Sequence, residues 1–251
     1  TLEQISGITY REASGDLREN PWAEPVNMDE IPFAYEDLKD FNHKIIYYES
    51  SRGCPFRCSY CLSSIDKRVR FRSLPLVEKE LQIFLDAQVP QVKFVDRTFN
   101  CNPKRTVELL QWILEHDNGI TNFHFEIAAD ITTEEELAIM EKMRPGLIQL
   151  EIGVQSTNPK TVEAIHRTMD LKKLEKVVSR VKSFGNIHQH LDLIAGLPYE
   201  DVDSFQKSFD DVYAMRPDQL QLGFLKVLKG SGMREDAPGY GINWHERAPY
   251  E

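Results

Sequence analysis

The sequence predicts an α/β fold: a partial, open (β/α)6 TIM-like barrel of parallel strands, preceded by an N-terminal linker layer. Short apolar or alternating runs are each followed by an amphipathic segment with helix signals, which is the pattern of parallel β–α units. There are six such runs, fewer than the eight strands of a closed (β/α)8 barrel, so the expected barrel is open on one side. The expected strands are residues 45–49, 92–96, 123–128, 147–153, 190–195 and 219–225.

Helix signals lie between these runs. Ser73 is the expected cap of a helix that ends near residue 87, and Asn102 followed by Pro103 begins a second helix. Thr133 and Glu136 form a capping box at the start of the third. Three further starts are expected at Asn158 with Pro159, at Asp170 with a stop at Gly185, and at Asp201 or Asp203.

Three segments are expected along the chain: a linker or flanking segment (1–44), a core (45–230) and a C-terminal extension of the core (231–251). The first has prolines and acidic residues without a sustained period, apart from a short hairpin expected around residues 7–17. The first residue is Thr and not Met, so the chain is expected to be a piece of a longer polypeptide, truncated at its C-terminal end.

Charge and hydropathy limit the partners of this chain. The formal net charge of −10 disfavours a nucleic-acid partner, because nucleic-acid-binding domains usually carry a basic surface, and it favours a small-molecule or protein substrate. No apolar run approaches the ~18 residues of a membrane-spanning helix, and residues 1–18 have no basic region followed by a hydrophobic stretch. We therefore expect a cytoplasmic protein with no membrane partner.

Three of the four cysteines lie on one predicted loop. Cys54, Cys58 and Cys61 follow the first strand in a C-x3-C-x2-C arrangement. In a parallel barrel, the loops after the strands build the active site. Cysteines at this spacing are poor disulfide partners in a fold of this size, which favours metal binding. Three thiolates can hold three irons of a [4Fe-4S] cluster and leave the fourth iron without a protein ligand.

A zinc-bound, non-catalytic interaction module is the alternative for this loop. A structural zinc site needs four closed ligands, usually in two pairs. The remaining cysteine, Cys101, stands alone about forty residues further on. A buried thiol of this kind usually has no ligand role, so none is assigned to it.

The cysteine loop resembles the signature of the radical S-adenosylmethionine superfamily, which has an aromatic residue before the third cysteine, here Tyr60. The resemblance extends from residue 45 to about residue 229. It implies that a reduced [4Fe-4S] cluster cleaves S-adenosylmethionine to methionine and a 5′-deoxyadenosyl radical, which then abstracts a substrate hydrogen. Here the cofactors carry the chemistry, while the protein provides their placement.

Further segments resemble the cofactor contacts of this superfamily. Asp96, in a motif F-x-D-x-x-F, would approach the methionine amino group; Ile194 belongs to a segment resembling D-x-I-x-G-L-P. By analogy with coproporphyrinogen dehydrogenases, Gln155 and Asp192 would bind the ribose hydroxyls with help from Glu126, and Arg167 would pair with the methionine carboxylate. No catalytic residue is assigned.

The same residues have simpler interpretations. Arg167 is placed on the helix that begins at Asn158 and could be a solvated surface cation. Asp96 could cap a turn. Asp192 stands between two leucines in an apolar strand, where a carboxylate without a partner would be costly.

The segments at both ends of the chain are similar to those of one branch of this superfamily, whose members carry a cobalamin-binding domain. The resembling segments are residues 7–11, 20–21, 29–33, 229–232 and 248–251. Members include anaerobic magnesium-protoporphyrin IX monomethyl ester oxidative cyclases and cobalamin-dependent methyltransferases. The resemblance thus implies an oxidoreductase acting on a tetrapyrrole, with a cobalamin-dependent methyltransferase as the alternative. The D-x-H-x-x-G cobalamin motif does not occur in these residues, so cobalamin is implied only for a longer protein.

A basic stretch, residues 67–72, follows the cysteine loop. Most such stretches are solvated surfaces. The alternative is that it docks an acidic electron donor such as flavodoxin or ferredoxin, because opposite charges accelerate encounter.

Overall fold

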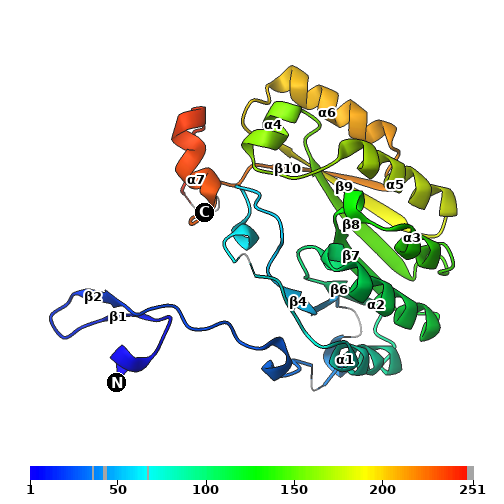
Figure 1. Ribbon diagram of the computed structural model, residues 1–251, viewed down its shortest axis with the longest axis horizontal. Coiled ribbons are helices and arrows are strands. Elements are labelled where there is room, and N and C mark those ends of the chain that lie inside the picture. Colours follow the sequence, from blue (N-terminus) through cyan, green and yellow to red (C-terminus); the bar gives the residue numbers. More distant parts are fainter. Residues whose placement is uncertain (36, 42–43, 67, 248–251) are drawn as a thin grey trace.

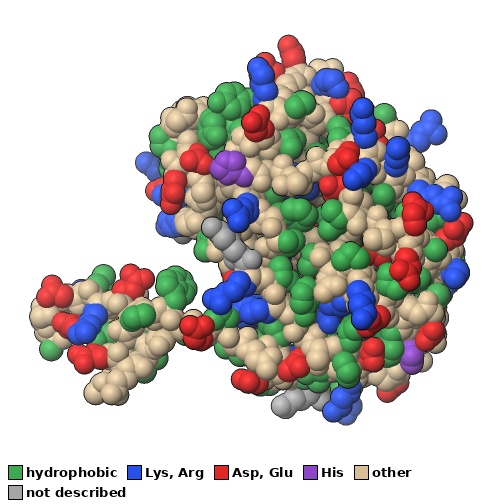
Figure 2. All heavy atoms as spheres, viewed as in Figure 1, with side chains coloured by type: hydrophobic (Ala, Val, Ile, Leu, Met, Phe, Trp, Pro, Cys, Tyr) green, Lys and Arg blue, Asp and Glu red, His purple; other side chains and the backbone are tan. Residues whose placement is uncertain are grey.

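The computed structural model describes residues 1–35, 37–41, 44–66 and 68–247. An extended N-terminal arm leads into an α/β body (Figure 1). Within the arm, strands β1 (Thr9–Arg11) and β2 (Leu17–Glu19) pair in antiparallel register, which confirms the expected hairpin and extends it to residue 19. Figure 2 shows the hairpin as a separate lobe joined to the body by a narrow neck.

The six expected core strands form one parallel sheet, so the predicted fold class is confirmed. Their order is β3-β6-β7-β8-β9-β10, and the two end strands do not pair with each other within the described residues, which leaves the barrel open. Each strand lies within about two residues of its predicted bounds. The strands are β3 (Ile46–Tyr48), β6 (Gln91–Phe94), β7 (Asn122–Ile127), β8 (Ile148–Gln155), β9 (His188–Ala195) and β10 (Gln219–Phe224).

Six helices connect these strands, and a seventh follows the last of them. They are α1 (Leu74–Asp86), α2 (Pro103–Glu115), α3 (Glu134–Met140), α4 (Pro159–Ala164), α5 (Leu171–Phe184), α6 (Val202–Ala214) and α7 (Gly232–Asp236). Helices α2, α3 and α5 cover one side of the curved sheet, and the cysteine-bearing segment lies on the other (Figure 1). Within the described residues, no helix is long and apolar enough to cross a membrane.

The predicted caps are formed, with one correction. Asn102, Asn158, Asp170 and Asp201 each accept a backbone N–H of the helix that follows, and Thr133 forms the capping box with Glu136. The side chain of Ser73, by contrast, makes no capping hydrogen bond. Instead its backbone N–H donates to Asp29 Oδ1 at 2.7 Å, so the N-terminal segment occupies this position.

The central strands have one apolar side and one polar side. In β8, Ile148, Leu150, Ile152 and Val154 are buried, while the alternate residues Gln149, Glu151, Gly153 and Gln155 are half-buried. The apolar side packs into one large core with the helices. Because side chains alternate across a strand, the polar side of β8 faces the interior of the open barrel.

Two of the three cations that the structure describes in the basic stretch after the cysteine loop are paired with carboxylates. Arg72 is buried, forms an ion pair with Glu80 and donates to the backbone carbonyl of Ile31, which fastens the N-terminal segment to the body. Arg70 pairs with Asp66. Of the remaining cations, Arg68 is exposed, and Lys67 lies outside the described residues. The resembling C-terminal residues 248–251 lie outside them as well.

Candidate active site

A cavity of about 190 Å³ opens at the carboxyl edge of the sheet. All three clustered cysteines line it, and all are free thiols. The cavity therefore brings together a loop after the first strand and the ends of three central strands. Five of the residues that the sequence predicts as cofactor contacts also line it: Tyr60, Glu126, Gln155, Arg167 and Asp192.

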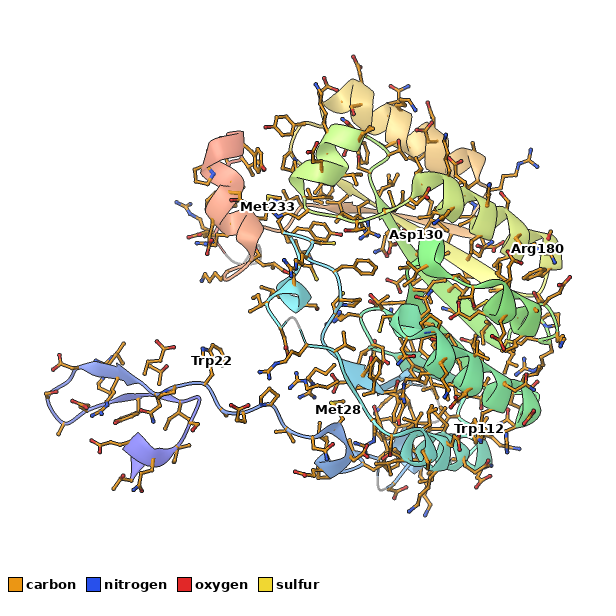
Figure 3. The ribbon with its side chains drawn as sticks, viewed as in Figure 1. Trp22, Met28, Trp112, Asp130, Arg180 and Met233 are labelled. Carbon is orange, nitrogen blue, oxygen red and sulfur yellow. The ribbon has the colours of Figure 1, made fainter. Side chains whose placement is uncertain are left out.

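The cysteine loop is held by backbone contacts on both sides. Gly53 has a φ of +97°, and a Cβ there would lie 2.4 Å from the carbonyl oxygen of Arg68, so only glycine fits. Further along, the Ser59 N–H donates to Ile165 O at 2.9 Å, and the Met233 N–H donates to Ser59 O at 2.8 Å. Figure 3 labels Met233 on α7, whose contact with Ser59 supports the loop from outside the barrel.

Arg167 lies beside the thiols. It lies three residues past the end of α4, which corrects its expected place on that helix. It is half-buried and points inward, so it is not a solvated surface cation: its Nη1 lies 3.7 Å from Cys58 Sγ and 3.3 Å from Tyr60 Oη. Its Nη2 donates to the carbonyl oxygen of Gly153. A guanidinium fixed in this way can bind a carboxylate beside the cysteines.

Gln155 is placed by a local irregularity at the end of β8. The pairing of β8 with β9 shifts between Gly153 and Gln155, and Gln155 has a φ of +73°. A Cβ on Gly153 would lie 2.4 Å from Gln155 Nε2, so the missing side chain makes room for the amide. The Oε1 atom of Gln155 is buried without a hydrogen-bond partner in the described structure. It is therefore available to accept from a ligand in the cavity.

Asp192 shares the interior of the barrel with two other carboxylates. Burial, and then the charges of Glu151 and Glu126, raise its pKa to about 7. Burial also raises the pKa of Glu126. The Oδ1 atom of Asp192 lies 3.0 Å from His190 Nε2, although the two atoms lack the alignment of a hydrogen bond. Hydroxyl donors from a ligand would stabilise the ionised form of this carboxyl group.

Glu151 is the carboxylate that stays charged. It lies 2.8 Å from Lys93 Nζ and 3.0 Å from His124 Nε2. The adjacent imidazole of His124 and the ammonium group of Lys93 lower its pKa to about 2 despite burial. The amide of Gln149 donates to His124 Nδ1 at 2.9 Å, which leaves Nε2 as the protonated nitrogen facing Glu151.

Two predicted cofactor contacts lie outside this cavity. Asp96 is only 1% exposed, and it accepts hydrogen bonds from Ser50 N–H at 2.7 Å, Ser50 Oγ at 2.6 Å and Ser51 Oγ at 2.7 Å. It thereby fastens the turn before the cysteine loop, and its contact with a methionine amino group stays a prediction. Ile194 lines a neighbouring cavity together with Tyr60.

The structure adds a charged layer below the cofactor contacts that the sequence predicts. It comprises Lys93, His124, Glu151 and His190, and Arg97 lies at the cavity's edge. The signal was present, because polar residues alternate with apolar ones in the strands that carry them. The sequence pattern does not contain the register of the strands, which pairs Lys93 with His124 and Glu151 with His190.

The residues on the cavity wall fit a cluster and a zwitterionic cofactor. Three free thiols border one space, with a fixed guanidinium at the middle cysteine, and the unpartnered amide oxygen of Gln155 belongs to a residue that borders the same space. Within the described residues, no three His, Cys, Asp or Glu side chains converge closely enough to hold a single metal ion.

Comparisons with known proteins agree with this arrangement. A model of the Radical SAM superfamily matches residues 48–212. The chain is 28% identical over 229 residues to an uncharacterized methyltransferase of Pyrococcus horikoshii, which covers 85% of this chain and 49% of that protein. It is 20% identical over 224 residues to the anaerobic magnesium-protoporphyrin IX monomethyl ester cyclase of Rubrivivax gelatinosus, covering 85% and 40% respectively. The chain thus spans about half or less of the length of these relatives.

A solved structure shows the same fold. The cobalamin-dependent S-adenosylmethionine radical enzyme OxsB, with aqua-cobalamin and S-adenosylmethionine bound, superposes with a TM-score of 0.74 at 17% identity. The match covers 98% of this chain and 43% of that one. At this identity the likeness concerns the fold alone.

Proposed function

The chain belongs to the Radical SAM superfamily, and on that premise we propose that Cys54, Cys58 and Cys61 hold a [4Fe-4S] cluster beside bound S-adenosylmethionine. The observation that carries the proposal is the cavity that gathers all three thiols with Arg167, Gln155 and Asp192. When bound, the reduced cluster supplies the electron that cleaves the sulfonium and yields a 5′-deoxyadenosyl radical.

The chain's own residues hold the cofactor in place. Arg167 binds the methionine carboxylate next to Cys58, since its guanidinium is already fixed there. Gln155 and Asp192 accept the two ribose hydroxyls, because one offers an unpartnered buried oxygen and the other a carboxyl group whose ionisation needs donors. Glu126 assists from the neighbouring strand, and Tyr60 and Ile194 form an apolar wall in the adjoining cavity.

Anaerobic reconstitution followed by absorbance and EPR spectroscopy tests this function. A [4Fe-4S] signal that changes when S-adenosylmethionine is added would support it. A colourless protein that retains one zinc per chain would instead support the zinc-bound interaction module.

We propose an oxidoreductase reaction of the oxidative cyclase type on a tetrapyrrole as the first candidate. Cobalamin-dependent methyl transfer by a longer form of the protein is the second, and the relative named as a methyltransferase supports it. The products separate the two reactions. Oxidation through the radical yields 5′-deoxyadenosine and methionine, whereas methyl transfer also yields S-adenosylhomocysteine.

Flavodoxin or ferredoxin is the proposed electron donor. Docking on the basic stretch has limited support, since Arg72 and Arg70 are already paired with carboxylates. If charge steering operates there, the rate of cluster reduction by flavodoxin should fall as salt is added. A rate indifferent to salt would contradict steering.

A further inference from the structure

Two further cavities continue from the cysteine cavity toward the C-terminal segment. The second, about 330 Å³, shares Tyr60, Cys61 and Arg97 with the first. The third, about 630 Å³, shares Phe224, Leu225, Lys226 and Leu228 with the second. The shared lining residues place the three cavities next to one another, and we call the three together the trough. Its last section has the size of a small-molecule site.

The walls of this last section are mainly apolar and aromatic. One wall is the end of β10 and the residues after it, where Phe224 is 82% exposed. The opposite wall includes Ile242 and Trp244 from the C-terminal segment. An aromatic side chain this exposed gains most when a ligand covers it, and flat rings stack well on such side chains.

The Trp244 wall is held in position before any ligand arrives. Its indole N–H donates to Glu246 at 2.9 Å, and the guanidinium of Arg234 lies 5.3 Å from its ring centre. Arg234 also pairs with Glu246 and belongs to α7, the helix that supports the cysteine loop. The far wall of the trough is therefore anchored to the same helix as the cysteine wall.

Two cations lie along the trough. Lys226 borders the second and third cavities, and Arg97 borders the first and second. In the part of the chain that the structure describes, Lys226 forms no ion pair or hydrogen bond, whereas Arg97 already faces an anion, because its charge acts to lower the pKa of Glu126. An unpaired cation such as Lys226 beside an apolar slot favours an anionic group on an apolar ligand.

From this trough we propose that the third cavity is the substrate site, and that it takes an extended conjugated molecule carrying a carboxylate. The ring system lies between Phe224 and Trp244, and the carboxylate meets Lys226. The inference rests on the proposed function, because it makes this cavity the place from which the substrate reaches the cysteine cavity. It adds the binding residues and the chemical class of the substrate.

The test measures binding of protoporphyrin IX to the anaerobically reconstituted chain in the presence of S-adenosylmethionine. The matched uncharged probe is protoporphyrin IX dimethyl ester. Quenching of tryptophan fluorescence is the readout, and Trp244→Phe should remove most of it, because Trp22 lies on the N-terminal arm and Trp112 on α2 (Figure 3). Lys226→Met should weaken binding of the diacid about three- to fivefold and leave the ester unaffected.

Lys229→Met is the matched control, since Lys229 is exposed in the same segment and lies outside the lining of the third cavity. The inference is overturned if the wild type does not bind the diacid, or if the ester binds equally well. It is also overturned if Lys226→Met behaves like Lys229→Met, or if Trp244→Phe is quenched as fully as wild type. Cluster spectra and S-adenosylmethionine titrations of the same variants report on the proposed function separately.

Discussion

The two walls of the cysteine cavity are built in different ways. The cysteine loop is positioned mainly by backbone hydrogen bonds, from Ser59 to Ile165 and from Met233 to Ser59, and its thiols form no disulfide. The strand wall is positioned by side chains that contact one another, with Glu151 between Lys93 and His124. A substitution in the loop should therefore remove one function cleanly. A substitution in the strand wall should also change the ionisation of its neighbours.

The largest effect is expected in the loop. Replacing Cys54, Cys58 or Cys61 with Ala should abolish cluster assembly, because three ligands leave no redundancy. Cys101→Ala is the matched control: burial raises the pKa of this thiol to about 11, so it stays protonated and is a poor ligand. Iron content after anaerobic reconstitution decides the point. A loss of iron in Cys101→Ala equal to the others would overturn the assignment.

The next effect is expected at Asp192 in the strand wall. Asp192→Ala should lower the affinity for S-adenosylmethionine roughly tenfold or more, which corresponds to about 1.4 kcal/mol, with cluster content nearly unchanged. The stability of the protein should respond in the opposite direction. Because the folded pKa is raised to about 7, the folded state holds its proton more tightly than the unfolded state between pH 4 and 7.

The contribution of Asp192 to the stability of the wild-type protein should thus fall as pH rises toward 7, and Asp192→Asn should remove this pH dependence. Titration with S-adenosylmethionine and thermal unfolding at pH 5 and pH 8 measure both effects. If Asp192→Ala binds the cofactor as tightly as wild type but unfolds at a much lower temperature at pH 8, the role of Asp192 is structural.

A smaller effect is expected from Gly153→Ala. The added Cβ would meet Gln155 Nε2 at 2.4 Å, and the flexible amide would move rather than the strand. We expect cofactor affinity to fall about fivefold, because an acceptor leaves the cavity, with little change in unfolding temperature. Gly223→Ala on β10 is the matched control, since a Cβ there has no heavy atom closer than Leu193 O at 3.7 Å. Equal affinities in the two variants would contradict the role of Gln155.

The two walls also differ in how far the sequence alone could predict them. The cysteine loop can be predicted because the spacing of its cysteines is local and specific. The six strands can be predicted from the pattern of their apolar residues. The ion pairs of Glu151 depend on which residues of separate strands face one another, and that register is set by tertiary packing. Arg167 was misplaced on a helix because the sequence between Ala164 and Asp170 carries no strong stop signal.

The smallest and most specific effect concerns the charge on Glu151. An ionised Asp192 accepts the ribose hydroxyls better than a protonated one, so wild-type cofactor affinity should rise with pH through about 7. Glu151 raises the pKa of Asp192, and Lys93 lowers it. Glu151→Gln should therefore move the midpoint of the affinity profile to lower pH, while Lys93→Met should move it to higher pH.

The opposite signs make this pair of variants a test of the electrostatic coupling. Both substitutions break the same 2.8 Å ion pair between Lys93 and Glu151. If this ion pair had a purely structural role, both profiles of affinity against pH would shift in the same direction, or both midpoints would stay unchanged. Affinity for S-adenosylmethionine measured at half-unit intervals between pH 5.5 and 8.5 would resolve the midpoints. Midpoints displaced in opposite directions would mean that the charged layer below the cavity sets the pH at which the strand wall holds the cofactor.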